Sequence, residues 1–195
     1  MSVTVRPLTG AELQDAIGDL AQLRITVFAA YPYCYDGDPG YEADYLRHFT
    51  AAPDAVLVAA IHGSRIVGAA TASPMGAQMD AIRAPFETRG IDTGRLFYFG
   101  ESVLLPEYRG KGIGHAFFDQ RERQARMAGA DRATFAAVIR PDSHPLRPAG
   151  YTPLDAFWRR RSYNPIAGLI TELAWKEHGE ADESLKPMQY WMREL

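Results

Sequence analysis

The sequence has little of what disulfides, cysteine-based metal sites and membrane spans require. Cys34 is its single cysteine, so no internal disulfide is available and no metal site of several cysteines can form. No stretch approaches the roughly 18 consecutive apolar residues that cross a bilayer. The first residues also lack the apolar run of a signal peptide. We therefore expect a cytoplasmic protein with no metal cofactor and no membrane partner.

The charges are nearly balanced, and no large excess of one sign is present. Lysine and arginine number 21, aspartate and glutamate number 24, and the formal net charge is −3. Domains that bind nucleic acid usually carry a basic stripe or a high pI, so we expect no nucleic-acid partner. Hydrophobic residues make up 47% of the chain, which is enough for a core without disulfides. The length fits a single domain that spans residues 1–195.

Hydrophobic periodicity predicts a mixed succession of strands and helices. The predicted strands cover residues 3–8, 55–61, 66–72, 96–105, 133–138, 169–175 and 188–193. A helix capped by Thr9 should end near Phe28, and shorter helical segments are predicted at about 42–49, 79–86, 112–128 and 154–161. Because a helix separates strands 96–105 and 133–138, these two strands should lie parallel in one α/β sheet.

One glycine-rich segment joins a predicted strand to a predicted helix. It reads Arg109-Gly110-Lys111-Gly112-Ile113-Gly114. Such a turn brings the backbone close to a ligand and leaves N–H groups unpaired at the helix start, where the helix dipole favours an anion. The two basic residues add positive charge, so the segment predicts a diphosphate-binding site. It fits neither the Walker A pattern nor the G-x-G-x-x-G dinucleotide pattern.

This segment resembles the acyl-CoA loop of the GNAT superfamily of N-acetyltransferases, written [RQ]-x-x-G-x-[GA]. Pro106-Glu-Tyr108, which precedes it, is also often seen in that family. The element order matches the superfamily along nearly the whole chain. The resemblance implies an α/β, GNAT-type acyl-CoA N-acyltransferase fold. That fold has a mixed central sheet of about seven strands flanked by helices, with splayed fourth and fifth strands.

The resemblance also implies the position of the cosubstrate, acetyl-CoA. Main-chain amides from Arg109 through Gly114 should bind its diphosphate. Leu104 and Leu105, at the end of the fourth strand, should bind its pantetheine arm through main-chain groups. A backbone N–H at one of these leucines should also stabilise the oxyanion, because a fixed donor needs little reorganisation.

Two catalytic residues follow from the same resemblance. An aliphatic amine has a pKa of about 10, so it must lose a proton before it attacks the thioester. Relatives place a carboxylate on the fourth strand, and Glu101 is the candidate; the alternatives are a charge on an exposed face of the strand or membership of an ion pair. Many relatives have a phenol in a late helix, but here the segment Phe157-Trp158-Arg-Arg-Arg-Ser162-Tyr163 departs from the pattern. Tyr163 is our candidate acid, with Tyr151 or unassisted departure of the thiolate as alternatives.

A loop rich in tyrosine and acidic residues follows the first helix, where relatives place substrate-binding elements. Tyr33, Tyr35 and Asp36 in this loop are candidates for binding a cationic amine through ring faces and charge. The alternative is an ordered loop whose rings pack and whose acids are solvated.

The sequence therefore predicts transfer of an acetyl group from acetyl-CoA to a primary amine of a small molecule or peptide, by direct attack on the thioester. A catalytically weak acyl-CoA sensor on the same fold is the alternative, and a longer acyl chain also stays open. The terminal strands and Trp191, which we expect to be exposed, leave a homodimer open.

Overall fold

A seven-stranded mixed sheet forms the centre of the protein. The structure is a computed structural model that describes residues 2–195. The strands are β1 (Val3–Leu8), β2 (Val56–His62), β3 (Arg65–Pro74), β4 (Leu96–Leu104), β5 (Arg132–Val138), β6 (Asn164–Trp175) and β7 (Ser184–Glu194). They are ordered β1-β2-β3-β4-β5-β7-β6, and β4 with β5 is the parallel pair among antiparallel neighbours.

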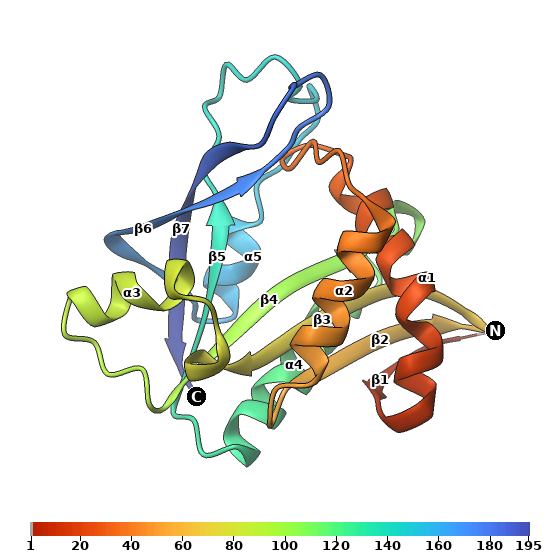
Figure 1. Ribbon diagram of the computed structural model, residues 1–195, viewed down its shortest axis with the longest axis horizontal. Coiled ribbons are helices and arrows are strands. Elements are labelled where there is room, and N and C mark those ends of the chain that lie inside the picture. The colour runs from red at the N-terminus through yellow and green to blue at the C-terminus, as the bar shows by residue number, and fades with distance from the viewer. Residues whose placement is uncertain (1) are drawn as a thin grey trace.

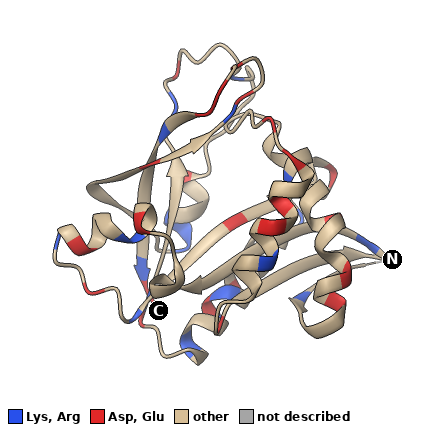
Figure 2. Ribbon diagram, in the orientation of Figure 1, with Lys and Arg blue, Asp and Glu red and all other residues tan. Residues whose placement is uncertain are grey.

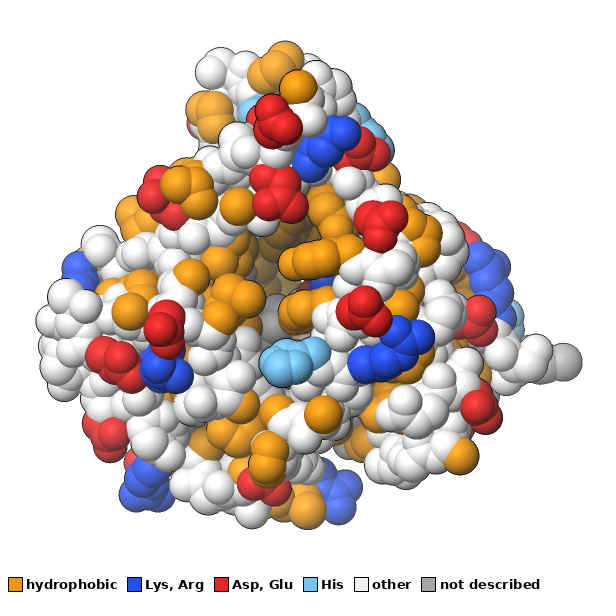
Figure 3. All heavy atoms as spheres, viewed as in Figure 1, with side chains coloured by type: hydrophobic (Ala, Val, Ile, Leu, Met, Phe, Trp, Pro, Cys, Tyr) orange, Lys and Arg blue, Asp and Glu red, His pale blue; other side chains and the backbone are white. Residues whose placement is uncertain are grey.

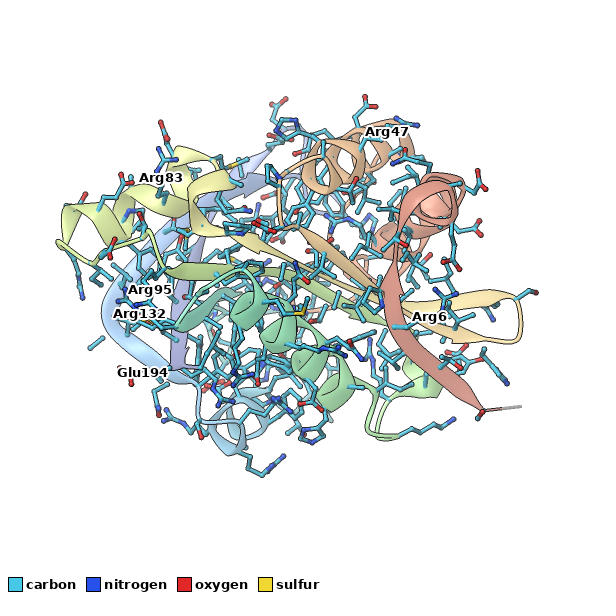
Figure 4. The ribbon with its side chains drawn as sticks, turned by 90° about the horizontal axis from the view of Figure 1, so that it is seen from below. Arg6, Arg47, Arg83, Arg95, Arg132 and Glu194 are labelled. Atoms are coloured by element: carbon cyan, nitrogen blue, oxygen red, sulfur yellow. The ribbon has the colours of Figure 1, made fainter. Side chains whose placement is uncertain are left out.

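Helices cover both faces of this sheet. They are α1 (Gly10–Phe28), α2 (Pro39–Thr50), α3 (Asp80–Thr88), α4 (Ile113–Met127) and α5 (Asp155–Arg160). Helices α1, α2 and α3 lie on one face, whereas α4 and α5 lie on the other (Figure 1). Figure 4 shows these layers nearly edge on, with the side chains of Arg6, Arg47 and Arg83 at the periphery. The predicted mixed α/β fold is confirmed. Within residues 2–195, no helix is long and apolar enough to pass through a membrane.

Helix α2 begins three residues before the predicted start at residue 42. Asp38 is its N-cap, and one carboxylate oxygen accepts a hydrogen bond from the Tyr41 N–H at 2.7 Å. Pro39 occupies the first turn, where its fixed φ angle suits a helix and its missing N–H costs nothing. Asp38 and Pro39 follow the first helix, where the sequence predicts a loop rich in tyrosine and acidic residues, and they instead start this second helix.

The C-terminal hairpin is longer than the sequence pattern predicts. Strand β6 begins at Asn164 instead of residue 169, and its pairing with β7 is irregular between Pro165 and Ile170. The prediction that Trp191 is exposed is wrong, because its side chain is 4% exposed. Strand β7 lies inside the sheet between β5 and β6, and the Trp191 ring packs against Trp158 with centroids 5.0 Å apart.

A bulge in β4 orients the middle of the candidate site. Gly100 and Glu101 lie opposite the single residue Thr71 of β3, so the register shifts at this point. The Thr71 hydroxyl oxygen accepts a hydrogen bond from the Glu101 N–H at 3.2 Å. Arg121 of α4, which is buried, donates to the carbonyl oxygens of Thr71 at 3.4 Å and Glu101 at 3.3 Å. Arg121 therefore holds the bulge from the α4 face, while the Glu101 side chain points toward α1 and α2.

Candidate active site

The parallel strands β4 and β5 pair at one end and separate at the other. Their three-residue register ends at Tyr98, which lies opposite Thr134. Beyond this point β4 continues to Leu104 and β5 continues to Val138 along diverging paths (Figure 1). The predicted splay of the fourth and fifth strands is confirmed, and it leaves main-chain groups of β4 facing a gap.

The two leucines at the end of β4 differ in the main-chain groups that they leave free. The Leu105 N–H donates to the Val67 carbonyl oxygen at 3.0 Å, so it faces β3. Because successive N–H groups of a strand point to opposite edges, the Leu104 N–H faces the gap. The Leu104 carbonyl oxygen accepts a hydrogen bond from Arg109 Nε at 3.2 Å. The expectation that Leu105 offers its N–H to a ligand is therefore corrected, whereas Leu104 keeps a donor directed at the gap.

The glycine-rich loop between β4 and α4 presents a row of N–H groups. Gly110 and Gly112 have φ angles of 73° and 79°, a left-handed conformation that glycine adopts without strain. Helix α4 starts at Ile113, and its N-cap Gly112 has no side chain to cap it. From Gly110 to His115, no main-chain N–H donates to an acceptor within residues 2–195. These amides are therefore free to bind an external anion.

The chemistry of this loop fits a diphosphate. Unpaired amides and the positive end of the α4 dipole point in the same direction, and both favour negative charge. Lys111 adds an ammonium group, which lies over the Tyr108 ring at 5.3 Å. Arg109 is directed back toward the end of β4 through its bond to Leu104. The loop and the gap between the strands are thus adjacent, as the binding of one extended cosubstrate requires.

Glu101 lies in a buried network that joins three elements of the α1–α2 face. Its carboxylate, with a side chain 8% exposed, forms an ion pair with Arg24 of α1. A second carboxylate, Glu42 of α2, binds the same guanidinium. Tyr45 donates a hydrogen bond from its hydroxyl to Glu101 at 3.3 Å, and Tyr35 donates to Glu42 at 2.7 Å. Glu101 is therefore an ion-pair member, and its carboxylate is held in place from two sides.

The ionisation of this network follows from burial and charge. Burial alone would lower the pKa of Arg24. Its charge interactions with Glu101, Tyr45 and Glu42 are stronger than this effect, so the pKa of Arg24 is raised. Burial, followed by the negative charge of Glu101, raises the pKa of Tyr45. Arg24 is thus charged and Tyr45 is a neutral hydrogen-bond donor at neutral pH. The guanidinium of Arg24 also lies over the Tyr45 ring, 4.5 Å from its centroid.

Tyr163 lies on the opposite face of the sheet from the Glu101 carboxylate. Its side chain is fully buried, and its hydroxyl donates to Glu122 of α4 at 3.2 Å. Its ring packs against Phe118 and Phe135, with centroids 5.2 Å away in both cases. Burial and then the Glu122 charge raise its pKa. This placement argues against the predicted role of Tyr163 as the acid and gives its hydroxyl a partner in the core.

The three candidate substrate-binding residues do not face one space. Tyr33 packs inward against Trp175, with ring centroids 5.7 Å apart. Tyr35 and Asp36 line a surface depression of about 470 Å³ on the outer side of the loop. Asp36 forms an ion pair with Lys176 at 3.2 Å. The structure therefore separates Tyr33, on the side of Glu101, from the exposed Asp36.

Sequence reasoning missed the network around Glu101, in which Arg24 and Tyr45 bind its carboxylate and Glu42 shares Arg24. A signal for Arg24 is present in the sequence. It lies four residues after Leu20, on a helix face whose other members are apolar, and a charge in such a position needs a buried partner. The identity of the partners depends on how α1, α2 and β4 pack, which no local pattern contains.

Comparisons with solved structures find the same fold. No curated protein matches the sequence. The chain is similar to a ribosomal-protein-alanine N-acetyltransferase from Brucella melitensis, with a TM-score of 0.64 and 12% identity, covering 98% of this chain and 99% of that one. It is similar to an N-acetyltransferase from Staphylococcus aureus Mu50, with a TM-score of 0.64 and 9% identity, covering 100% and 99%. It is also similar to a phosphinothricin acetyltransferase from Sinorhizobium meliloti in complex with AcCoA. That comparison has a TM-score of 0.59 and 18% identity, and it covers 100% of this chain and 89% of that one.

The sequence itself matches a model of the acetyltransferase (GNAT) family over residues 21–148, which is more than half of the chain. The match begins within α1 and ends beyond β5. It contains the ion pair, the bulge, the separated strands and the glycine-rich loop described above. The protein therefore belongs to the acetyltransferase (GNAT) family and is an acyl-CoA-dependent N-acetyltransferase.

Proposed function

We propose that this protein transfers an acetyl group from acetyl-CoA to a primary amine of a small molecule or peptide, by direct attack of the amine on the thioester. The observation that carries the proposal is the row of free amides from Gly110 to His115 beside the separated strands β4 and β5. We also propose that residues 1–195 form one N-acetyltransferase domain. The cytoplasmic location and the homodimer stay predictions.

The loop residues Arg109, Gly110, Lys111, Gly112, Ile113 and Gly114 would hold the diphosphate of acetyl-CoA. Bound acetyl-CoA supplies the thioester that the acceptor attacks. The Leu104 N–H, which faces the gap, is a fixed donor for the oxygen that becomes negative during the transfer. Its orientation is set by β4 itself, so little reorganisation is needed when the charge develops.

Glu101 is our candidate for removing the proton of the acceptor. The amine, with a pKa of about 10, is an ammonium ion at neutral pH and must lose a proton before its nitrogen can form a bond to carbon. The Glu101 carboxylate would receive that proton, directly or through water. Arg24 and Tyr45 hold the carboxylate in one orientation. In the overall reaction a C–N bond forms and the C–S bond breaks. The ammonium nitrogen loses two protons, of which one is released and one is balanced by protonation of the leaving thiolate.

The leaving thiolate needs no acid from Tyr163 in this scheme. A thiol has a pKa of about 8.5, so its anion is a moderately good leaving group that solvent can protonate later. Because the Tyr163 hydroxyl is buried and bonded to Glu122, we propose unassisted departure.

The proposal is tested by following free thiol while the protein is incubated with acetyl-CoA and a panel of amines. Glu101→Gln should lower kcat/KM by 10²- to 10⁴-fold, the range for loss of a general base, and leave the Kd for CoA unchanged. Glu107→Gln, at an exposed acid close to the loop, is the matched control and should behave as wild type. Tight CoA binding with no thiol release across the panel would instead support the acyl-CoA sensor.

A further inference from the structure

The gap between β4 and β5 opens into a hollow on the face that carries α1 and α2. Figure 3 shows this hollow between α2 and the diverging end of β5, and hydrophobic side chains line most of its wall. Tyr45 donates a hydrogen bond to the Glu101 carboxylate at 3.3 Å. Burial is the largest cause that raises the pKa of Tyr33 and of Tyr98; Tyr151 and Tyr190 come next, and the charge of Glu101 adds to both shifts. The hollow therefore combines an apolar, aromatic wall with one buried carboxylate at its base.

On the α1–α2 side of the sheet, the buried charges next to this hollow sum to one negative charge, whereas buried Arg121 lies on the α4 side. Glu42 and Glu101 contribute two negative charges, and Arg24, which lies between them, contributes one positive charge. Figure 2 shows acidic residues on α2 and on β4 on this side of the molecule. A ligand in the hollow thus meets an excess of negative charge in a partly buried place, where charge interactions are stronger than in water.

The arginines of this region are already occupied by carboxylates. Arg24 is bound by Glu42 and Glu101, as described above. Arg140, at the end of β5, forms an ion pair with Glu177. Its other donors reach the main-chain carbonyl oxygens of Pro32 at 2.8 Å and Tyr33 at 3.4 Å. Each guanidinium charge is therefore already compensated by at least one carboxylate, so neither offers an uncompensated positive charge to a carboxylate or phosphate of a ligand.

Tyr98 supplies an independent sign that a ligand binds here. Its side chain is at the last paired position of β4 and β5, and the residue is 6% exposed. Its hydroxyl makes no hydrogen bond to any residue of the described chain, 2–195, although buried hydroxyls are normally paired. Within the described residues, the enclosed side-chain polar atoms without a partner belong to other residues, so the Tyr98 hydroxyl oxygen is accessible to solvent. Tyr33 packs against the buried cluster that contains Tyr98. Burial, then Tyr190, Tyr45, Tyr33 and Glu101, raise the pKa of Tyr98.

We propose that the acceptor is a small amine that carries one positive charge on an apolar or aromatic body and bears no carboxylate or phosphate. This inference rests on the proposed function and names its substrate class. The ammonium group would lie against Glu101 and the tyrosine rings, with its N–H groups directed to the carboxylate and the Tyr98 hydroxyl oxygen. An anionic group on the same molecule would be repelled by the excess negative charge and would meet only arginines whose charge is already compensated by a carboxylate.

The test compares amines with the amino acids that differ from them by one carboxylate. The pairs are 2-phenylethylamine with phenylalanine, tyramine with tyrosine and tryptamine with tryptophan, with thiol release as the readout. We expect kcat/KM for the amine to exceed that for the amino acid by about 100-fold, as for two like charges about 6 Å apart in a partly buried site. Phenylalanine amide keeps the bulk of phenylalanine without the anionic charge, and it should recover most of the activity of 2-phenylethylamine.

A charge variant separates electrostatics from shape. Glu42→Gln removes one negative charge from the buried group of Glu42, Arg24 and Glu101. The ratio of kcat/KM for an amine to kcat/KM for its amino acid should therefore fall by about tenfold or more. Asp44→Asn is the matched control, because Asp44 lies on the same helix with its side chain 80% exposed and pairs with the exposed Arg47. It should keep the wild-type preference. These ratios are taken between substrates of the same variant, so a change in the active fraction of protein cancels.

The outcomes are distinct for the two proposals. Equal or better kcat/KM for the amino acids, or no recovery with phenylalanine amide, would overturn the acceptor class while the acetyltransfer reaction stands. No thiol release with any amine, in protein that binds CoA, would refute the proposed function and this inference with it. A preference that is unchanged in Glu42→Gln would also contradict the electrostatic argument.

Discussion

Gly100 is the position where a single methyl group should disturb the candidate site most directly. A Cβ atom added there would lie 2.4 Å from the Thr71 hydroxyl oxygen, far inside a normal contact. The same oxygen accepts the hydrogen bond from the Glu101 N–H, so relief of the clash must move the bulge. Overpacking of this kind costs about 1–3 kcal/mol. Alanine also reduces the conformational entropy of the unfolded chain, which offsets up to about 1 kcal/mol of this cost.

We therefore expect Gly100→Ala to lower the free energy of unfolding by about 1–2 kcal/mol. A shift of the bulge also moves the Glu101 carboxylate, and a misplacement of about 1 Å in a catalytic group can cost about 100-fold in rate. The double variant with Thr71→Ala removes the offending oxygen, and the Thr71 Cβ then lies at an ordinary 3.7 Å. Thr71→Ala alone loses one hydrogen bond, worth about 1 kcal/mol.

The assay is a double-mutant cycle measured by urea unfolding, with kcat/KM determined for the same proteins. The double variant should be no less stable than Thr71→Ala alone, which gives a favourable coupling of about 1–2 kcal/mol. Gly18→Ala in α1 is the control, because open space surrounds its added Cβ and alanine favours a helix by about 0.5–1 kcal/mol. Strict additivity of Gly100→Ala and Thr71→Ala would refute the reasoning.

Three further changes test other parts of the account. Gly112→Asp should raise the Kd for CoA, measured by calorimetry, at least 100-fold, because a carboxylate would face the diphosphate. Gly112→Ala has the same left-handed backbone strain without the charge, so its Kd for CoA should rise far less. Tyr163→Phe should lower the free energy of unfolding by about 1 kcal/mol and change kcat by less than twofold, whereas a loss of 100-fold or more would restore Tyr163 as the acid. The Glu177 N–H, and then Lys186 and Ser184, lower the pKa of Glu180 to about 2 from 4.5. Its contribution to stability is therefore present above about pH 4.5 and lost as the pH falls toward 2, so the Tm difference between wild type and Glu180→Gln should shrink over that interval; a constant difference would exclude this carboxylate as the cause.

The glycine-rich loop was the part of the site that the sequence predicted best. Two glycines with positive φ and a following helix form a local signal, and the predicted helix start at residue 112 differs from the observed start by one residue. The parallel pairing of β4 with β5 followed from the helix between them, which is also local information. The splay and the fold class came with the family resemblance.

The environment of Glu101 was beyond local patterns. Its partners Arg24 and Tyr45 are far away in the sequence and meet it only when α1, α2 and β4 pack. For the same reason, the sequence did not show that Tyr163 turns into the core and away from the gap. The start of β6 was missed because Pro165 and Gly168 argue locally against a strand, whereas pairing with β7 overrides that preference.

The central claim is that the free amides at the start of α4 bind the diphosphate of acetyl-CoA. Backbone hydrogen exchange and amide chemical shifts, measured by NMR with and without acetyl-CoA, test it residue by residue. We predict large shifts and slowed exchange for the amides from Gly110 to His115, whose N–H groups have no acceptor within residues 2–195. Saturating acetyl-CoA that leaves these amides unshifted and unprotected would contradict the account.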